Sequence, residues 1–87
     1  MSWDEISYVV ASKTRKSIVL KLETPRTPTF LAKDLNLNLA NVSRSLSELE
    51  NKGVIVCLTP DKRTGKIYSL TKKGTQTLET IKNMEKV

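Results

Sequence analysis

The sequence predicts a mainly α-helical (α+β) domain with one small β-hairpin, in the order α-α-α-α-β-β-α. Two observations predict this class. Apolar residues recur at helical spacing in five stretches, and two short runs rich in β-branched residues lie between the fourth stretch and the fifth. The loop between these runs contains Pro60, Asp61 and Gly65, which are typical of a turn. With 87 residues, the chain fits one domain, residues 1–87.

Two helices are expected before residue 24. Ser2 followed by Glu5 has the form of a capping box, which predicts a first helix over about residues 3–11. A second helix is expected over roughly residues 14–23. Apolar residues of the first helix are Trp3, Ile6, Val9 and Val10, and those of the second are Ile18, Val19 and Leu22.

A helix–turn–helix segment, about residues 28–52, follows a connector with two prolines. Thr27 is placed to cap a short helix over about residues 28–35, because proline suits the first helical position. After a three-residue turn, Asn38 caps the helix of residues 39–52, which Gly53 ends in a left-handed conformation. The apolar stripe of that helix consists of Leu39, Val42, Leu46 and Leu49.

The hairpin is expected over about residues 54–70, and Thr71 caps a last helix over about residues 72–86. The two terminal helices, about residues 3–11 and 72–86, carry more apolar surface than so small a core can cover. We therefore expect a homodimer. The expected interface residues are Trp3, Tyr8, Leu78, Ile81 and Met84. The alternative is that these residues only close the core of the single chain.

The order and spacing of two motifs indicate a known family. The first is Thr27-Pro28-x-x-Leu31-Ala32-x-x-Leu35, followed by Asn41-Val42-Ser43-Arg44-x-Leu46-x-x-Leu49 and Gly53-Val54-Ile55. The second is Gly65-Lys66-Ile67-Tyr68-Ser69-Leu70-Thr71-x-x-Gly74. Together they resemble the winged helix-turn-helix regulators of the MarR-like and ArsR-like groups, of the small single-domain prokaryotic type. In that resemblance, the hairpin is the wing.

The resemblance implies a transcription regulator that binds double-stranded DNA. It implies that the recognition helix, residues 39–52, enters the major groove. It also implies that the wing loop, residues 59–66, contacts the adjacent minor groove or the sugar-phosphate backbone. The alternatives are a winged-helix module that binds protein and a chromatin-like protein that binds DNA without sequence preference.

The exposed face of residues 39–52 carries side chains that can read bases. Asn41 can pair with adenine, Arg44 can pair with guanine, and serine side chains are short enough for close approach. The candidate base contacts are Asn41, Ser43, Arg44 and Ser47. The candidate contacts to the DNA backbone and from the wing are Thr27, Thr29, Lys33, Asn38, Lys62, Arg63 and Lys66. The competing interpretation is an ordinary solvated surface.

Composition bounds the remaining classes. Lysine and arginine total 15 against 9 aspartate and glutamate, a net charge of +6 that favours a polyanionic partner. Histidine is absent and Cys57 is the only cysteine, so we expect no metal, no cofactor and no enzymatic activity. No apolar run could span a membrane, so we expect a cytoplasmic protein. No residue pattern indicates a small-molecule effector.

Overall fold

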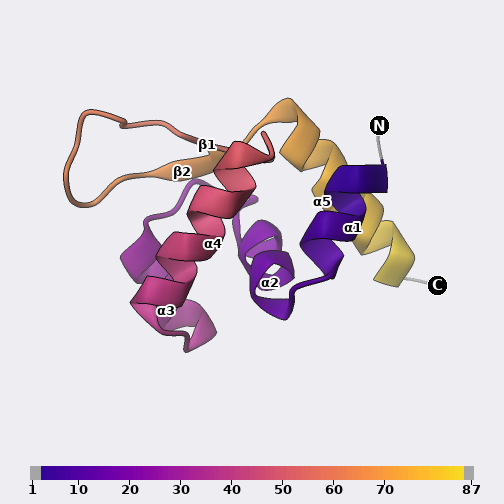
Figure 1. The fold of residues 1–87 in the computed structure, drawn as a ribbon, viewed down its shortest axis with the longest axis horizontal. Helices are drawn as coiled ribbons and strands as arrows, with labels where there is room; N and C mark the ends of the chain where they lie inside the picture. Colours follow the sequence, from indigo (N-terminus) through magenta and orange to yellow (C-terminus); the bar gives the residue numbers. More distant parts are fainter. Residues whose placement is uncertain (1–2, 86–87) are drawn as a thin grey trace.

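The computed structural model describes residues 3–85, and within them it contains five helices and one antiparallel hairpin (Figure 1). The helices are α1 (Trp3–Val10), α2 (Lys13–Lys21), α3 (Pro28–Leu35), α4 (Leu39–Asn51) and α5 (Lys72–Glu85), and the strands are β1 (Ile55–Cys57) and β2 (Tyr68–Leu70). The predicted fold class and element order are confirmed. α2 begins one residue earlier than predicted, because Ser12 caps it by accepting a hydrogen bond from the Arg15 amide at 3.3 Å.

Four predicted helix ends are confirmed. Thr27 Oγ1 accepts a hydrogen bond from the Phe30 amide at 3.2 Å, and Asn38 Oδ1 accepts one from the Ala40 amide at 2.7 Å. After α4, Gly53 has a φ of 77°, in the left-handed region that favours glycine. Thr71 Oγ1 accepts a hydrogen bond from the Gly74 amide at 3.0 Å and so caps α5.

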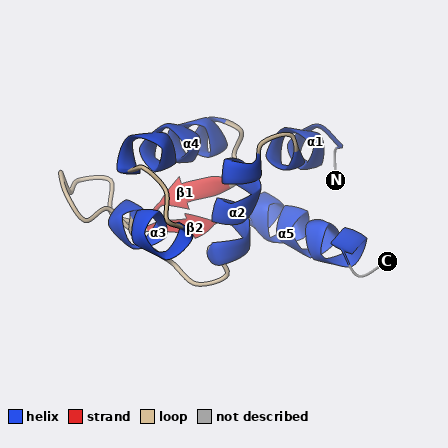
Figure 2. Ribbon diagram, turned by 90° about the horizontal axis from the view of Figure 1, so that it is seen from below, coloured by secondary structure: helices blue, strands red, loops and turns tan. Residues whose placement is uncertain are grey.

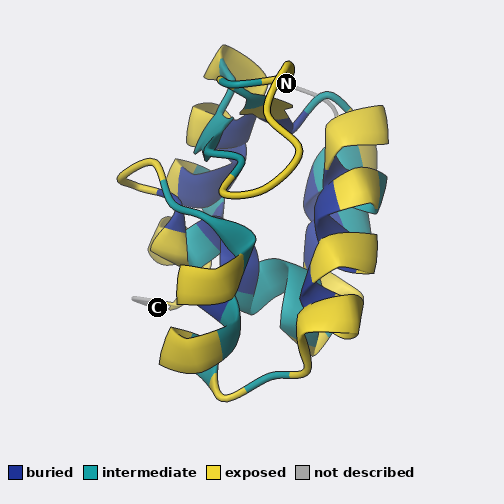
Figure 3. Cartoon of the chain, turned by 90° about the vertical axis from the view of Figure 1, so that its left-hand side faces the viewer, coloured by how far each residue is buried: buried dark blue, intermediate teal, exposed yellow. Residues whose placement is uncertain are grey.

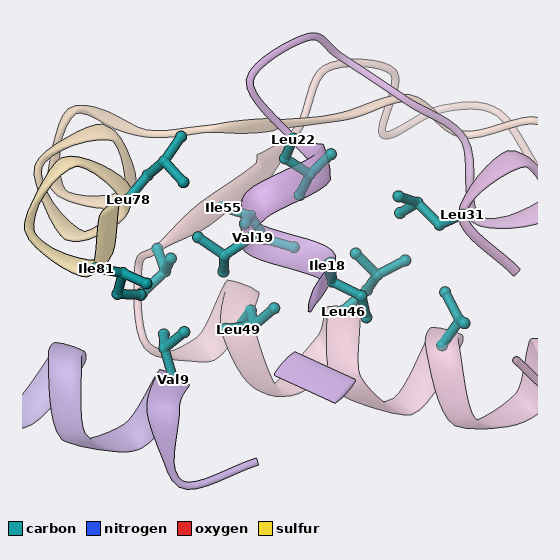
Figure 4. Close-up of a cluster of buried hydrophobic side chains, with 12 residues drawn as sticks. Val9, Ile18, Val19, Leu22, Leu31, Leu46, Leu49, Ile55, Leu78 and Ile81 are labelled. Carbon is teal, nitrogen blue, oxygen red and sulfur yellow. The ribbon is translucent and has the colours of Figure 1, made fainter. Parts of the chain in front are cut away.

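The core draws on every helix and on the start of the hairpin. Figure 4 shows Val9 of α1, Ile18 of α2, Leu46 of α4 and Ile81 of α5 in the same cluster. α2 contacts each of the other four helices, so it is the central element of the fold.

Two residues of the predicted apolar faces are not buried. Leu39 is 48% exposed, whereas Val42, Leu46 and Leu49 of the same stripe are at most 1% exposed. The helical spacing gives the direction of a side chain around the axis. It does not show that the first turn of α4 extends beyond the core. Val10, at the last position of α1, is 37% exposed for the same reason.

Within the hairpin predicted over about residues 54–70, each strand has three residues, and Val54 is fully buried just before β1. They pair in the register Ile55↔Leu70, Val56↔Ser69 and Cys57↔Tyr68. The connector before α3 adds a bridge that the sequence did not predict. The Arg26 amide donates to the Tyr68 carbonyl at 3.0 Å, and the Tyr68 amide donates to the Arg26 carbonyl at 2.8 Å. The connector therefore covers the free edge of β2.

The fold has two distinct ends along a longest extent of 38 Å. α3, the first turns of α4 and the wing loop lie at one end, and α1 and α5 lie at the other (Figures 1 and 2). Viewed from the wing side, exposed residues cover the loop and the outer faces of the helices, and buried residues face inward (Figure 3).

The predicted dimer residues occupy different environments. Leu78 and Ile81 are 4% and 1% exposed inside the core of the single chain, so their side chains are not available to a partner. This burial matches the alternative in which they close the monomer core. Met84 is 47% exposed, and Tyr8 is half-buried beneath the guanidinium of Arg15. The side chain of Trp3 lies outside the described part of the chain.

Candidate nucleic-acid interface

A hollow of about 290 Å³ lies between the start of α3, the first turns of α4 and the wing loop. Four of the predicted DNA contacts line it: Thr29 from α3, Ser43 from α4, and Arg63 and Lys66 from the wing loop. The other residues that line it are Pro28, Leu39, Thr64, Gly65 and Tyr68. The fold therefore brings together Thr29 and Lys66, which are 37 positions apart in the sequence.

Asn41 and Arg44 lie on the other flank of α4. Both are exposed, and Arg44 Nη2 donates a hydrogen bond to Asn41 Oδ1 at 3.1 Å. They line a second hollow, of about 310 Å³, beside the start of α2. Ser47 is exposed between the two flanks, so all four candidate base contacts are accessible from solvent.

The remaining predicted contacts surround these two flanks. Thr27 and Asn38 already use their side-chain oxygens as helix caps, which leaves the amide nitrogen of Asn38 as its free donor. Lys33 is exposed and lines a third hollow beside Leu39. Lys62 is exposed within the wing loop, and its amide donates to the Thr59 carbonyl at 3.1 Å.

The wing loop is braced where it leaves the strands. The Leu58 amide donates to the Ile67 carbonyl at 2.7 Å, and the Ile67 amide donates to Thr59 Oγ1 at 3.0 Å. Gly65, with a φ of 66°, turns the chain back toward β2. These contacts hold the base of the loop, and the side chains from Asp61 to Gly65 are exposed.

Five ion pairs join residues of the described range 3–85, and none of them involves a predicted DNA contact. They are Arg15–Glu48, Lys16–Glu85, Lys21–Asp34, Lys73–Glu5 and Lys82–Glu23. Each pair links two different helices, except that Glu23 follows α2. The cations with no ion-pair partner in this range include Lys33, Arg44, Lys62, Arg63 and Lys66. These five lie on α3, on α4 and in the wing loop, and the other unpaired cations of this range are Lys13, Arg26, Lys52 and Lys72.

Arg15 lies in the first turn of α2, where the helix dipole disfavours a cation. Its Nε donates to the Tyr8 carbonyl at 2.8 Å, its guanidinium stacks 3.9 Å from the centroid of the Tyr8 ring, and it lies 3.7 Å from Glu48. Arg15 is therefore held by partners within the chain.

The structure adds three residues to the site that the sequence did not indicate. Leu39 and Tyr68 line the hollow at the wing, and Arg26 lies next to it with its guanidinium 4.4 Å from the centroid of the exposed Phe30 ring. Burial, followed by the nearby Cys57 and Glu50, raises the pKa of Tyr68, so its phenol stays protonated at neutral pH. The prolines around Arg26 predicted an extended backbone, but nothing in the sequence indicated which strand it would join.

Neither a metal centre nor a membrane span is found in the described part of the chain. Within residues 3–85, no three aspartate, glutamate or cysteine side chains lie together as metal ligands would. No helix in this range is both long enough and apolar enough to cross a lipid bilayer.

Comparison with known proteins identifies what the arrangement resembles. A family model described as winged helix-turn-helix matches residues 8–87. No curated protein sequence matches.

Three solved structures illustrate the likeness. The MarR family transcription regulator SP03579 is 24% identical, with a TM-score of 0.77, over 94% of this chain and 56% of that one. The transcriptional repressor CouR, solved bound to a 23-mer DNA duplex, is 28% identical, with a TM-score of 0.74, over 94% of this chain and 63% of CouR. The homodimeric winged helix-turn-helix DNA-binding domain of Mb0332 from Mycobacterium bovis, a possible ArsR-family regulator, is 16% identical. Its TM-score is 0.78, over 95% of this chain and 77% of that one. The chain thus spans little more than half the length of the MarR family regulator.

Proposed function

Because the chain belongs to the winged helix-turn-helix family, we propose that it is a transcription regulator that binds double-stranded DNA in a sequence-specific manner. α4 occupies the major groove, and the wing loop contacts the adjacent minor groove or the sugar-phosphate backbone. The similarity to CouR, which was solved with DNA, supports this proposal.

The observation that carries the proposal is the separation of paired from free cations. Arg15 and Lys16 of α2 and Lys73 and Lys82 of α5 are bound to carboxylates, although, within the described range, Lys13 and Lys72 of the same helices are not. At the other end of the fold, Lys33, Arg44, Lys62, Arg63 and Lys66 are in none of the ion pairs within residues 3–85. Charges that have no internal partner remain available for phosphate groups. All five lie on the elements that meet at the wing end of the fold.

Each flank of α4 has a role in this proposal. Arg44 and Asn41 contact base edges on one flank, where a guanidinium can donate two hydrogen bonds to guanine and an amide can pair with adenine. Ser43 approaches the groove on the other flank, next to Arg63 and Lys66 of the wing loop, and Ser47 approaches it between the two flanks. Thr27, Thr29 and Asn38 lie at the starts of α3 and α4, and Lys33 lies in the last turn of α3. These four residues contact phosphates.

We propose that α1 and α5 form a homodimer at the end opposite the wing. Tyr8, Val10 and Met84 are the described apolar residues of these helices that are partly or mainly exposed. A two-fold dimer presents two recognition helices to half-sites about one DNA turn apart, or about 34 Å. The homodimeric state of the Mb0332 domain supports this arrangement.

Selection of bound sequences from a random pool of DNA duplexes, combined with sizing of the complex, tests the proposal. We expect enrichment of a pseudo-palindrome that is bound by two chains. Binding without enrichment would support a chromatin-like protein that binds DNA without sequence preference. No binding to any duplex would overturn the proposal and would favour a module that binds protein.

A further inference from the structure

The most unusual residue of the proposed DNA surface is Leu39, the first residue of α4. Its spacing places it in the apolar stripe, yet it is 48% exposed while the rest of that stripe is buried. Neither the core nor the helix cap accounts for it, because Asn38 supplies the cap through its own side chain. Single exposed leucines are common on protein surfaces, so position has to show whether this one has a role.

Leu39 borders two hollows at the wing end of the molecule. One, of about 290 Å³, contains Ser43 and the wing cations Arg63 and Lys66. The other, of about 370 Å³, contains Ala32, Leu37 and the exposed Lys33. Leu39 and Ser43 are four residues apart in α4, so their side chains point within about 40° of each other around the helix axis. An apolar group therefore lies among the polar and cationic groups of the proposed DNA surface.

The surroundings of Leu39 decide what kind of partner fits it. An apolar protein surface would have to remove Lys33, Arg63 and Lys66 from water without a counter-charge, which is unfavourable. The major groove of DNA presents phosphates for these cations, and its base edges include one apolar group, the 5-methyl group of thymine. A duplex therefore satisfies both the charges and the leucine.

We infer that Leu39 reads the 5-methyl group of a thymine in each half-site. This inference rests on the proposed function, since it requires α4 to lie in the major groove. It assigns to α4 an apolar contact that complements the hydrogen bonds of Asn41 and Arg44. It predicts that the preferred sequence contains a thymine whose methyl group contributes to affinity.

Replacement of thymine by deoxyuridine tests the inference, because it removes the methyl group and leaves the hydrogen-bonding edges of the base pair unchanged. In the selected duplex, each thymine of one half-site is replaced in turn, and the dissociation constant is measured by fluorescence anisotropy. We expect one position at which deoxyuridine weakens binding about fourfold, the loss that corresponds to one buried methyl group. 5-Bromouracil at that position, with a bromine of similar size to a methyl group, should restore binding.

The variant Leu39→Ala should bind the thymine and deoxyuridine duplexes equally well. Leu39→Met, which keeps an apolar side chain of similar volume, should retain the preference. Val56→Ala is the matched control, because Val56 is also exposed, at 40%, but lies on β1 outside the hollows that Leu39 borders. It should leave the ratio of the two dissociation constants unchanged. Circular dichroism of each variant reports whether it is folded, and Leu39→Gln replaces the alanine variant if that one is not.

The outcomes separate this inference from the proposed function. Binding with a sequence preference, but with no thymine sensitive to loss of its methyl group, would overturn the inference and leave the function intact. A preference for thymine that persists in Leu39→Ala or Leu39→Gln would also overturn it, because another residue would then read the methyl group. Absence of binding to any duplex would overturn both.

Discussion

Replacement of Gly74 by alanine is a direct test of how α5 packs on the hairpin. Gly74 is buried in the first turn of α5, and a Cβ atom there would lie 1.9 Å from the carbonyl oxygen of Val54. That distance is about 1.5 Å short of the 3.4 Å at which ordinary contact begins. The Val54 carbonyl is also held in place, because it accepts hydrogen bonds from the Thr71 amide at 3.1 Å and from Thr71 Oγ1 at 3.2 Å.

Two opposing effects determine the change in stability. Alanine is favoured over glycine inside a helix by about 1 kcal/mol. Adding a group to a filled site costs about 1–3 kcal/mol, and more where rigid backbone must move. Because the atom that Cβ meets is a hydrogen-bonded backbone oxygen, we expect the clash to dominate. The free energy of unfolding of Gly74→Ala should therefore be lower than that of the unmodified chain by about 2 kcal/mol.

Urea unfolding followed by circular dichroism measures this change, and the two other glycines are matched controls. Gly53 and Gly65 have φ values of 77° and 66°, and a Cβ atom at either would meet no atom closer than 3.6 Å. Alanine at these positions should lower the free energy of unfolding only by the strain of a left-handed conformation, about 1–2 kcal/mol. An argument from φ alone would rank Gly74→Ala as the mildest of the three. If Gly74→Ala is as stable as the unmodified chain, α5 packs less closely against the Val54 carbonyl than the structure indicates.

Three further predictions concern the surface and the hairpin. Arg44→Ala should weaken binding to the selected duplex by about 1–3 kcal/mol with little change on scrambled DNA; equal losses on both would make Arg44 a phosphate contact. Replacing Lys62 and Arg63 with glutamine should reduce the slope of log affinity against log salt by about one to two, whereas the ion-paired Lys21→Gln should not change it. An unchanged slope in the double variant would remove the wing loop from the interface. The pKa of Tyr68 is raised, mainly by burial. The contribution of Tyr68 to the free energy of unfolding should therefore be constant below about pH 10 and fall as the pH rises further, because the unfolded chain releases the phenol proton first. Thermal unfolding of Tyr68→Phe should show a smaller fall over that range, and an equal fall would contradict the assignment.

The sequence predicted well those features that depend on local backbone chemistry. Caps at Thr27 and Asn38, and the left-handed Gly53, follow from residue types at the ends of a helix, and all three are present. The inner stripe Val42, Leu46 and Leu49 follows from helical periodicity, and these residues are buried. Each of these predictions needs information from only a few neighbouring residues.

Features that depend on where elements end in space were not predictable in this way. Leu39 shares the direction of its stripe but lies beyond the core, so only the fold shows that it is exposed. Leu78 and Ile81 fill the core of the single chain, since α5 folds back onto α1 and α2. Arg26 pairs with Tyr68, a partner 42 positions away, and no local pattern specifies such a pairing.

The hairpin divides into a base that stabilises the fold and a loop that is free to bind. At the base, the single hydroxyl proton of Thr71 is shared between the carbonyl oxygens of Gly53, 2.6 Å from Oγ1, and Val54, 3.2 Å from it, and Oγ1 accepts from the Gly74 amide at 3.0 Å. One hydroxyl thus ties together the end of α4, the start of β1 and the start of α5.

Within the wing loop, the side chains of Lys62 and Arg63 are exposed and make none of these contacts, and the Lys62 amide bonds only to the Thr59 carbonyl of the same loop. Surface substitutions without such contacts usually change stability by less than about 0.5 kcal/mol. The charge of the loop can therefore change while the orientation of the hairpin relative to α4 is retained. It follows that variants of the base should alter the fraction of folded protein and leave the affinity of the folded molecules unchanged, whereas variants of the loop should do the reverse.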